Sequence, residues 1–234
     1  MQLLGAAYHA LHPDDDVKVM LPPPSSGGGI RMLASGKLDL ALSGRPLKAD
    51  EKPQVGLSFQ LASTPLVFVG RGMARENGFT RSEIADLYAG RLTHWKDGSK
   101  VSLILRSAYE SETTQLRTLS PAVDEAIRLA HERPGMAYAE NDLDAVALLS
   151  KTPGSFGTST LGLLKTMNHA LQIYPLDGVA PSLQTLGAGK YPLSKPVFLI
   201  AGRQPSNSSK RFLEYLRSAA AKDILQRNGY LAAP

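Results

Sequence analysis

The spacing of apolar and polar positions predicts short helices and strands that alternate from the start of the chain. Apolar residues recur at helical spacing over residues 2–12 and predict a first helix. Residues 17–21 predict a short strand, and residues 28–35 predict a second helix. Residues 38–43 predict another strand, apolar enough to be buried on both faces. This order indicates an α/β fold with a parallel sheet.

The remainder of the chain continues the alternation without an internal repeat. Further strands are predicted over residues 66–70, 101–105, 155–158, 171–176 and 196–201. A capping box, Thr80-Arg81-Ser82-Glu83, predicts the start of a helix. Other helices are predicted from about residue 114 to 120 and over residues 121–133, 143–151, 160–167, 206–220 and 221–227. Asn141-Asp142 is expected to cap the helix over residues 143–151. Ligands of open α/β sheets bind beyond the carboxyl ends of strands, which places candidate sites in the loops that follow.

The composition and charge of the chain limit the kinds of ligand and partner that we expect. The chain has 234 residues, which favours one or two domains, and it is 43% hydrophobic and 20% charged, as in ordinary globular proteins. The formal net charge is +5, but lysines and arginines are scattered and aromatic residues make up only 6%. We therefore expect no nucleic-acid partner, and a mildly basic surface suits a small anionic ligand.

Several kinds of chemistry find no support in the sequence. The absence of cysteine excludes disulfides and thiol catalysis, and the histidines are too dispersed to predict a metal site. No cofactor is expected. No apolar run reaches the length of a membrane span, and no signal segment opens the chain. No Gly-x-Ser-x-Gly elbow is present, so we expect no enzyme.

The stretch at residues 22–30 carries the clearest local signal for binding. Three prolines stiffen the chain before Ser25, Ser26 and Gly27, and two more glycines follow at the start of the second helix. Ser26 is a suitable N-cap, and glycines allow the first amides of the helix to approach a bound group. A helix N-terminus of this kind favours anions. The alternative is a flexible loop with no ligand.

Several stretches resemble one known family in an unbroken order. They are Ser-Ser-Gly-Gly-Gly-Ile at 25–30, Ala-Ser-Gly-Lys-Leu-Asp-Leu-Ala-Leu-Ser-Gly-Arg-Pro-Leu at 34–47, and the segments 80–97, 141–157, 190–193 and 228–230. Together they resemble the phosphate-binding proteins of bacterial phosphate ABC transporters, which are type 2 periplasmic binding proteins. The resemblance covers nearly the whole chain.

The resemblance implies an α/β fold of two lobes, each with a mainly parallel sheet flanked by helices. Two hinge strands, near 64–69 and 193–199, would join the lobes. Lobe 1 would then comprise residues 1–66 plus 194–234, and lobe 2 residues 67–193. The ligand is expected in a cleft between the lobes, which closes when the hinge strands bend.

The resemblance also implies ligand-binding residues. Ser26 matches a serine that binds the oxyanion through its hydroxyl and amide, and Arg106 matches the guanidinium that pairs with it. The family's Ser-Gly-Thr loop corresponds to Ser111, Glu112 and Thr113. The full set of expected ligand-binding residues is Ser25, Ser26, Gly27, Gly44, Arg45, Arg106, Ser111, Glu112, Thr113 and Asn141.

Two positions depart from the family's pattern within this set. Gly44 stands where phosphate-selective members have an aspartate that accepts a proton of hydrogen phosphate, and the neighbouring Arg45 is expected to bind the ligand or to brace the turn. Glu112 places a negative charge in an anion loop. Either its side chain points to solvent, or it selects a ligand with a cationic or hydroxyl part.

The implied function is that of an extracytoplasmic solute-binding protein for a small oxyanion, phosphate or a relative. Its partners would be the membrane subunits of an ABC transporter, or a sensor. Met1 falls inside the family's first helix, so an upstream strand, a ligand loop and a signal segment are expected before it. Two alternatives stay open: a regulatory or protein-interaction module with a degenerate cleft, and an enzyme acting on a small phosphorylated or carboxylated compound.

Overall fold

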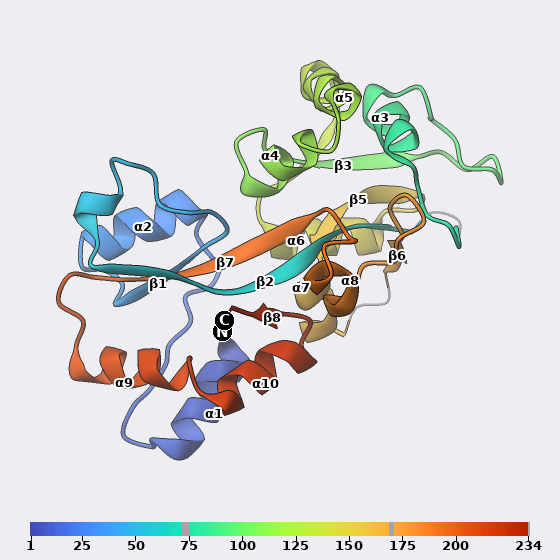
Figure 1. Cartoon of the computed structure of the whole chain (residues 1–234). Helices are drawn as coiled ribbons and strands as arrows, with labels where there is room; N and C mark the ends of the chain where they lie inside the picture. Colours follow the sequence, from blue (N-terminus) through green and yellow to red (C-terminus); the bar gives the residue numbers. More distant parts are fainter. Residues whose placement is uncertain (72–74, 169–170, 234) are drawn as a thin grey trace. The chain divides into compact units, whose positions relative to one another are not determined.

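The chain forms two compact units, each with its own core. The structure, a computed structural model, describes residues 1–71, 75–168 and 171–233. Unit 1 comprises Met1–Ser63 and Pro196–Pro234, and unit 2 comprises Thr64–Lys195. The chain passes between the units twice, in β2 (Leu57–Gly70) and in β7 (Ser194–Ala201) (Figure 1).

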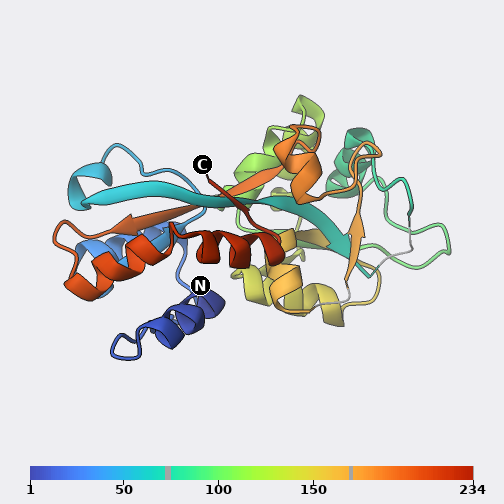
Figure 2. The same cartoon turned by 60° about the horizontal axis from the view of Figure 1, so that its bottom comes forward.

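Unit 1 is a small sheet with helices on both faces. β1 pairs with β7 and β8 pairs with β2, both antiparallel. Ile30 and Leu33 of α2 pack with Ala41 and Ile200 on one face. α1, α9 and α10 lie on the other face (Figure 2). Tyr8 of α1 is buried there in one cluster with Phe212 of α9 and Leu225 of α10. The element bounds are α1 (Gln2–Leu11), α2 (Ser26–Ala34), β1 (Leu40–Ser43), the 3-10 turn η1 (Lys52–Gln54), α9 (Asn207–Tyr215), α10 (Ala219–Arg227) and β8 (Leu231–Ala232).

Unit 2 has a mixed sheet between two helical layers. β3 pairs in parallel with β4 and β5, while β2 pairs antiparallel with β5 and β6. The elements other than β2 are α3 (Arg81–Ala89), β3 (Ser102–Arg106), α4 (Ser111–Arg117), α5 (Pro121–Glu132), β4 (Ala137–Ala139), α6 (Asp142–Lys151), β5 (Ser155–Thr160), α7 (Leu161–Thr166), β6 (Gln172–Tyr174) and α8 (Leu183–Gly187).

Alternation along β2 divides the core of unit 2. Phe68 points to the face covered by α3 and α5, where Phe79, Trp95 and Phe156 are buried with it. Its neighbours Val67 and Val69 point to the face covered by α6 and α7. Successive side chains of a strand face opposite ways, so one strand serves both cores.

The predicted α/β class is confirmed, and so are the locally encoded helix starts. Thr80 and Glu83 form both hydrogen bonds of a capping box on α3. Asn141 caps α6 by accepting from the amides of Leu143 and Asp144. These signals lie within one helical turn, so the sequence alone specifies them.

Two strand predictions are wrong. Residues 17–21 form no strand, and Val19, Met20 and Leu21 are partly exposed. A strand requires a backbone partner, and none of the described strand pairings includes this segment. β1 is not buried on both faces, because Leu42 is 39% exposed. β1 lies at an edge of the sheet, so other elements cover its faces less completely than those of a central strand.

The parallel character of the sheets holds only in part. Strands β3, β4 and β5 are connected through helices and run parallel where they pair. The other described ladders are antiparallel, in unit 1 as well as between β2 and its partners in unit 2.

Candidate functional site

α2 begins at Ser26, two residues earlier than the predicted start at residue 28. Ser25, not Ser26, is the N-cap, and its side chain accepts from the Gly28 amide at 3.3 Å. Ser26 is the first residue of the helix. Its own amide and that of Gly27 have no acceptor inside the helix, as at any helix start.

Ser26 instead connects α2 to the turn after β1. Its hydroxyl oxygen accepts from the Gly44 amide at 3.0 Å, which leaves the hydroxyl hydrogen available for donation. A Cβ added at Gly27 would lie 3.4 Å from Nη1 of Arg31 and 3.8 Å from Nη2 of Arg45. Two guanidinium groups therefore lie close to this helix start, and sequence reasoning had noticed only one of them.

Arg45 braces the turn that carries Gly44. Its guanidinium donates two hydrogen bonds of 2.7 Å to the carboxylate of Glu51, and Ser43 accepts from the Arg45 amide. Hydrogen bonding from Arg45 is the main cause that lowers the pKa of Glu51 to about 2. Of the two expected roles of Arg45, the bracing role is thus observed, and a role in ligand binding stays a prediction.

Arg106 ends β3 in unit 2 and is buried, with 7% of its surface exposed. Its Nε and Nη1 groups are buried and have no hydrogen-bond partner among the described residues. A guanidinium always carries its charge, and its N–H groups can only donate. Buried donors without acceptors cost free energy, so an arrangement of this kind requires a physical explanation.

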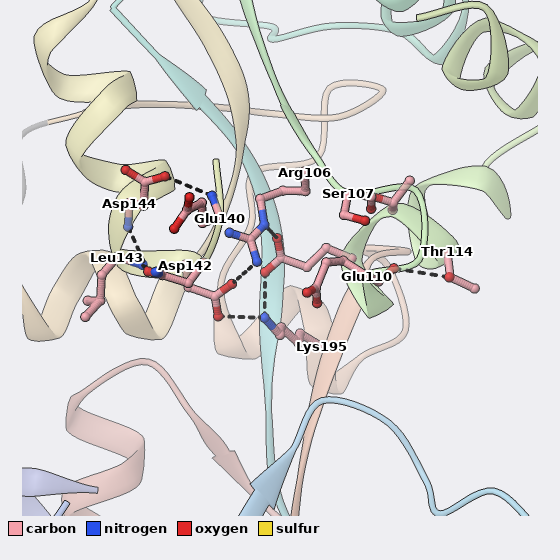
Figure 3. Close-up of polar contacts among 12 residues, drawn as sticks. Arg106, Ser107, Glu110, Thr114, Glu140, Asp142, Leu143, Asp144 and Lys195 are labelled. Atoms are coloured by element: carbon pink, nitrogen blue, oxygen red, sulfur yellow. Dashed lines mark hydrogen bonds and ion pairs between the residues drawn. The ribbon is translucent and has the colours of Figure 1, made fainter. Parts of the chain in front are cut away.

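Arg106 belongs to a group of four charged side chains, two basic and two acidic. Its Nη2 lies 3.2 Å from Oδ1 of Asp142, and its Nε lies 3.8 Å from Oε2 of Glu112. Lys195 joins the two acids, because its Nζ donates to Glu112 Oε1 at 2.6 Å and to Asp142 Oδ2 at 2.8 Å. Figure 3 shows Arg106 and Lys195 approaching Asp142 from the ends of β3 and β7. We call these four residues the charge cluster.

The charge cluster favours the ionised forms of the Lys195 ammonium and the Asp142 carboxylate. Burial alone would lower the pKa of Lys195, but the carboxylates of Glu112 and Asp142 outweigh it and raise that pKa above its ordinary value. Burial likewise opposes ionisation of Asp142, yet Lys195 and Arg106 hold its pKa below the usual range. The cluster contains two acidic and two basic side chains, so their formal charges cancel.

The other expected residues of unit 2 lie around the cluster. Ser111 is the first residue of α4, and the Thr113 hydroxyl donates to the Ser107 carbonyl at 2.9 Å. The side-chain oxygen Oδ1 of Asn141 caps α6 by accepting from the amides of Leu143 and Asp144. Glu112 does not point to solvent, because only 3% of its side chain is exposed.

The structure thus brings Arg106 and Glu112 together and adds Asp142 and Lys195, which sequence reasoning did not select. Lys195 had no local signal, since it meets Glu112 across 83 positions of sequence. Asp142 stood next to a recognised cap, but a first-turn acid is ordinary there. Convergence of Ser26 with Arg106 and Ser111 stays a prediction, because Ser26 belongs to unit 1 and the other two to unit 2.

Among residues 1–71, 75–168 and 171–233, no group of three histidine or acidic side chains is arranged to hold a metal ion. Within the same ranges, the helices are too short or too polar to cross a bilayer.

Comparison with known proteins gives consistent relatives. A family model described as the PBP superfamily domain matches residues 1–220. A phosphate-binding protein PstS from Bacillus subtilis is 22% identical over 98% of this chain and 76% of its own length. PstS of Staphylococcus epidermidis is 23% identical over 94% of this chain and 71% of its own length.

Solved structures show the same fold at low sequence identity. A substrate-binding protein from Clostridium perfringens with bound phosphate aligns with a TM-score of 0.80 at 17% identity, covering 100% of this chain and 94% of its own. An ABC-type phosphate transport receptor from Vibrio cholerae aligns with a TM-score of 0.69 at 21% identity, covering 100% and 95%. None of these relatives supports the alternative of a module with a degenerate cleft.

Proposed function

The chain belongs to the PBP superfamily, and from this premise we propose that it captures a small oxyanion, phosphate or a close relative. The names of its relatives, which are phosphate-binding proteins, support this class of ligand. We propose a binding protein rather than an enzyme. It would act outside the cytoplasm and pass the anion to the membrane subunits of an ABC transporter or to a sensor.

The observation that carries the proposal is that two N–H-bearing nitrogens of the Arg106 guanidinium are unpaired in the part of the chain that the structure describes. Nε and Nη1 are buried, charged and without an acceptor among the described residues. An oxyanion supplies acceptors in the geometry that a guanidinium fits best. Binding would satisfy donors whose isolation otherwise costs about 1–3 kcal/mol each.

The start of α2 supports the same class of ligand from unit 1. The Ser26 hydroxyl has its hydrogen available, and the first-turn amides of α2 point out of the helix. These groups are neutral donors, and the positive end of the helix dipole adds to them. They bind an anion without adding a full counter-charge.

Isothermal titration calorimetry with phosphate tests the proposal. We expect Arg106→Met to weaken phosphate binding at least 30-fold, since losing charged hydrogen bonds costs about 2 kcal/mol or more. Arg106→Lys keeps the charge but loses the planar fork, so an intermediate affinity is expected. The protein should first be unfolded, dialysed and refolded, so that anion acquired during expression is removed.

Arg128→Met is a matched control. Arg128 lies on the exposed side of α5 between Glu125 and Glu132, and its loss changes the net charge by the same amount. We expect its phosphate affinity to equal that of the wild type. A folded Arg106→Met variant that binds phosphate as tightly as the Arg128→Met variant would refute the assigned site.

A further inference from the structure

Glu112 is a buried acidic side chain beside Arg106, and the capture of an oxyanion at Arg106 does not by itself explain it. The inference below rests on the proposed function. Glu112 is buried in the first turn of α4, where the resembled family has glycine. Its Oε1 accepts from Lys195. Its Oε2 lies 3.8 Å from Nε of Arg106, beyond hydrogen-bond distance, and that Nε has no other partner in the described parts of the chain.

This geometry restricts the kind of oxyanion that can bind. An ionised carboxylate only accepts hydrogen bonds, and so does an oxyanion that has lost all its protons. Placed beside Arg106, a fully ionised anion would meet the like charge of Glu112 with no proton between the two oxygens. The charge cluster offers no net positive charge to offset this repulsion, because Lys195 is already shared between Glu112 and Asp142.

An oxyanion that keeps one proton meets both groups. One of its anionic oxygens accepts from Arg106, and its hydroxyl donates to Oε2 of Glu112. Gly44, which follows β1 in unit 1, has no side chain that could accept a hydrogen bond from this hydroxyl. Asp142 is already engaged at both oxygens, by Arg106 and by Lys195. Within the charge cluster, Oε2 of Glu112 is therefore the carboxylate oxygen with the weakest contact to a basic group.

We propose that Glu112 is a specificity-determining residue, which accepts a hydrogen bond from a hydroxyl of the bound oxyanion and thereby selects protonated tetrahedral anions over fully ionised ones. Phosphate retains a proton near neutral pH, whereas sulfate does not, and the two anions are alike in size and shape. The ratio of their affinities therefore isolates the effect of the proton.

Glu112→Gln tests the proposal, because it keeps the size of the side chain and removes its charge. We expect the preference for phosphate over sulfate to fall at least tenfold, mainly because sulfate binds more tightly. Glu110→Gln is the control. Glu110 lies two residues before Glu112 and is half-buried, and its substitution changes the net charge by the same amount. The control should leave the ratio of affinities unchanged.

A second measurement uses only the wild-type protein and covers the case of a variant that fails to fold. Methyl phosphate has a second pKa near about 6, so it keeps a proton at pH 5 and is fully ionised at pH 8. We expect its affinity to fall at least tenfold between these pH values. Phosphate keeps a proton at both, so its affinity should change much less.

The outcomes separate this inference from the proposed function. An unchanged phosphate-to-sulfate ratio in Glu112→Gln, or equal pH dependence for methyl phosphate and phosphate, would overturn the role of Glu112 while leaving oxyanion capture at Arg106 intact. Failure of Arg106→Met to weaken phosphate binding would overturn the proposed function. Wild-type protein that binds neither phosphate nor sulfate would overturn both.

Discussion

Lys195→Met should destabilise unit 2, because it leaves the buried carboxylate of Glu112 and the partly exposed carboxylate of Asp142 without the ammonium that joins them. The Nζ of Lys195 lies 2.6 Å from Glu112 and 2.8 Å from Asp142. Removing one partner of a buried ion pair costs about 3–5 kcal/mol. Asp142 is 39% exposed and keeps Arg106 at 3.2 Å, so both features reduce the loss. We expect the free energy of unfolding to fall by about 2–4 kcal/mol at pH 7.

The assay follows Trp95, the only tryptophan of the chain, during urea unfolding. Trp95 is 5% exposed in the core of unit 2, so its fluorescence reports on that unit. Lys190→Met is the matched control, since Lys190 is an exposed lysine in the same unit. We expect the control to stay within about 0.5 kcal/mol of the wild type.

Acidification should reduce the difference between Lys195→Met and the wild type. In the wild type the pKa of Asp142 is lowered, so its contribution is present above the unfolded pKa, about 3.9, and is lost as pH falls through the folded value. In the variant, protonation of the acids relieves their repulsion. A loss of stability that equals the control's at pH 7, or that grows toward pH 4, would refute this reasoning.

Two further predictions concern other parts of the molecule. Asp15→Asn should accelerate amide hydrogen exchange in α1 at pH 7, because the Asp15 carboxylate accepts hydrogen bonds from Tyr8, Ser208 and Arg211. Hydrogen bonds, foremost those from Arg211, hold the pKa of Asp15 below the usual range, so this stabilisation is present above the unfolded pKa and is lost as pH falls through the folded value. Unchanged exchange would contradict the role of these hydrogen bonds in holding α1. Gly78→Ala should lower the stability of unit 2 more than Gly98→Ala, measured by Trp95 fluorescence. Both glycines have positive φ, which costs alanine about 1–2 kcal/mol, but only at Gly78 would the new Cβ clash with the Pro175 carbonyl. Equal losses of stability in the two variants would contradict this clash.

Local signals allowed much of the fold to be predicted from sequence. The capping box at Thr80 and the cap at Asn141 are set by residues within one turn, and both were confirmed. The strand at residues 17–21 was wrong because strand formation depends on a partner elsewhere in the chain. The direction of strand pairing is also set at long range, so the antiparallel ladders of β2 were not foreseen.

The site was predictable only where residues matched a known pattern. Resemblance selected Arg106 and drew attention to Glu112, but the partners of these residues come from distant positions. Lys195 belongs to β7, near the end of the chain, and nothing beside it in the sequence indicates a buried ammonium. Ser26 shows a subtler limit, because the cap role fell to its neighbour Ser25 while Ser26 bonded the Gly44 amide instead.

The central claim is that the unpaired N–H groups of Arg106 receive the anion. The most direct measurement is the 15N-1H NMR signal of the Arg106 Nε–H, assigned by its loss in Arg106→Lys and followed during a phosphate titration. We predict a downfield proton shift that saturates at the same phosphate concentration as the calorimetric binding curve. A signal that stays in place while phosphate saturates the protein would contradict the claim.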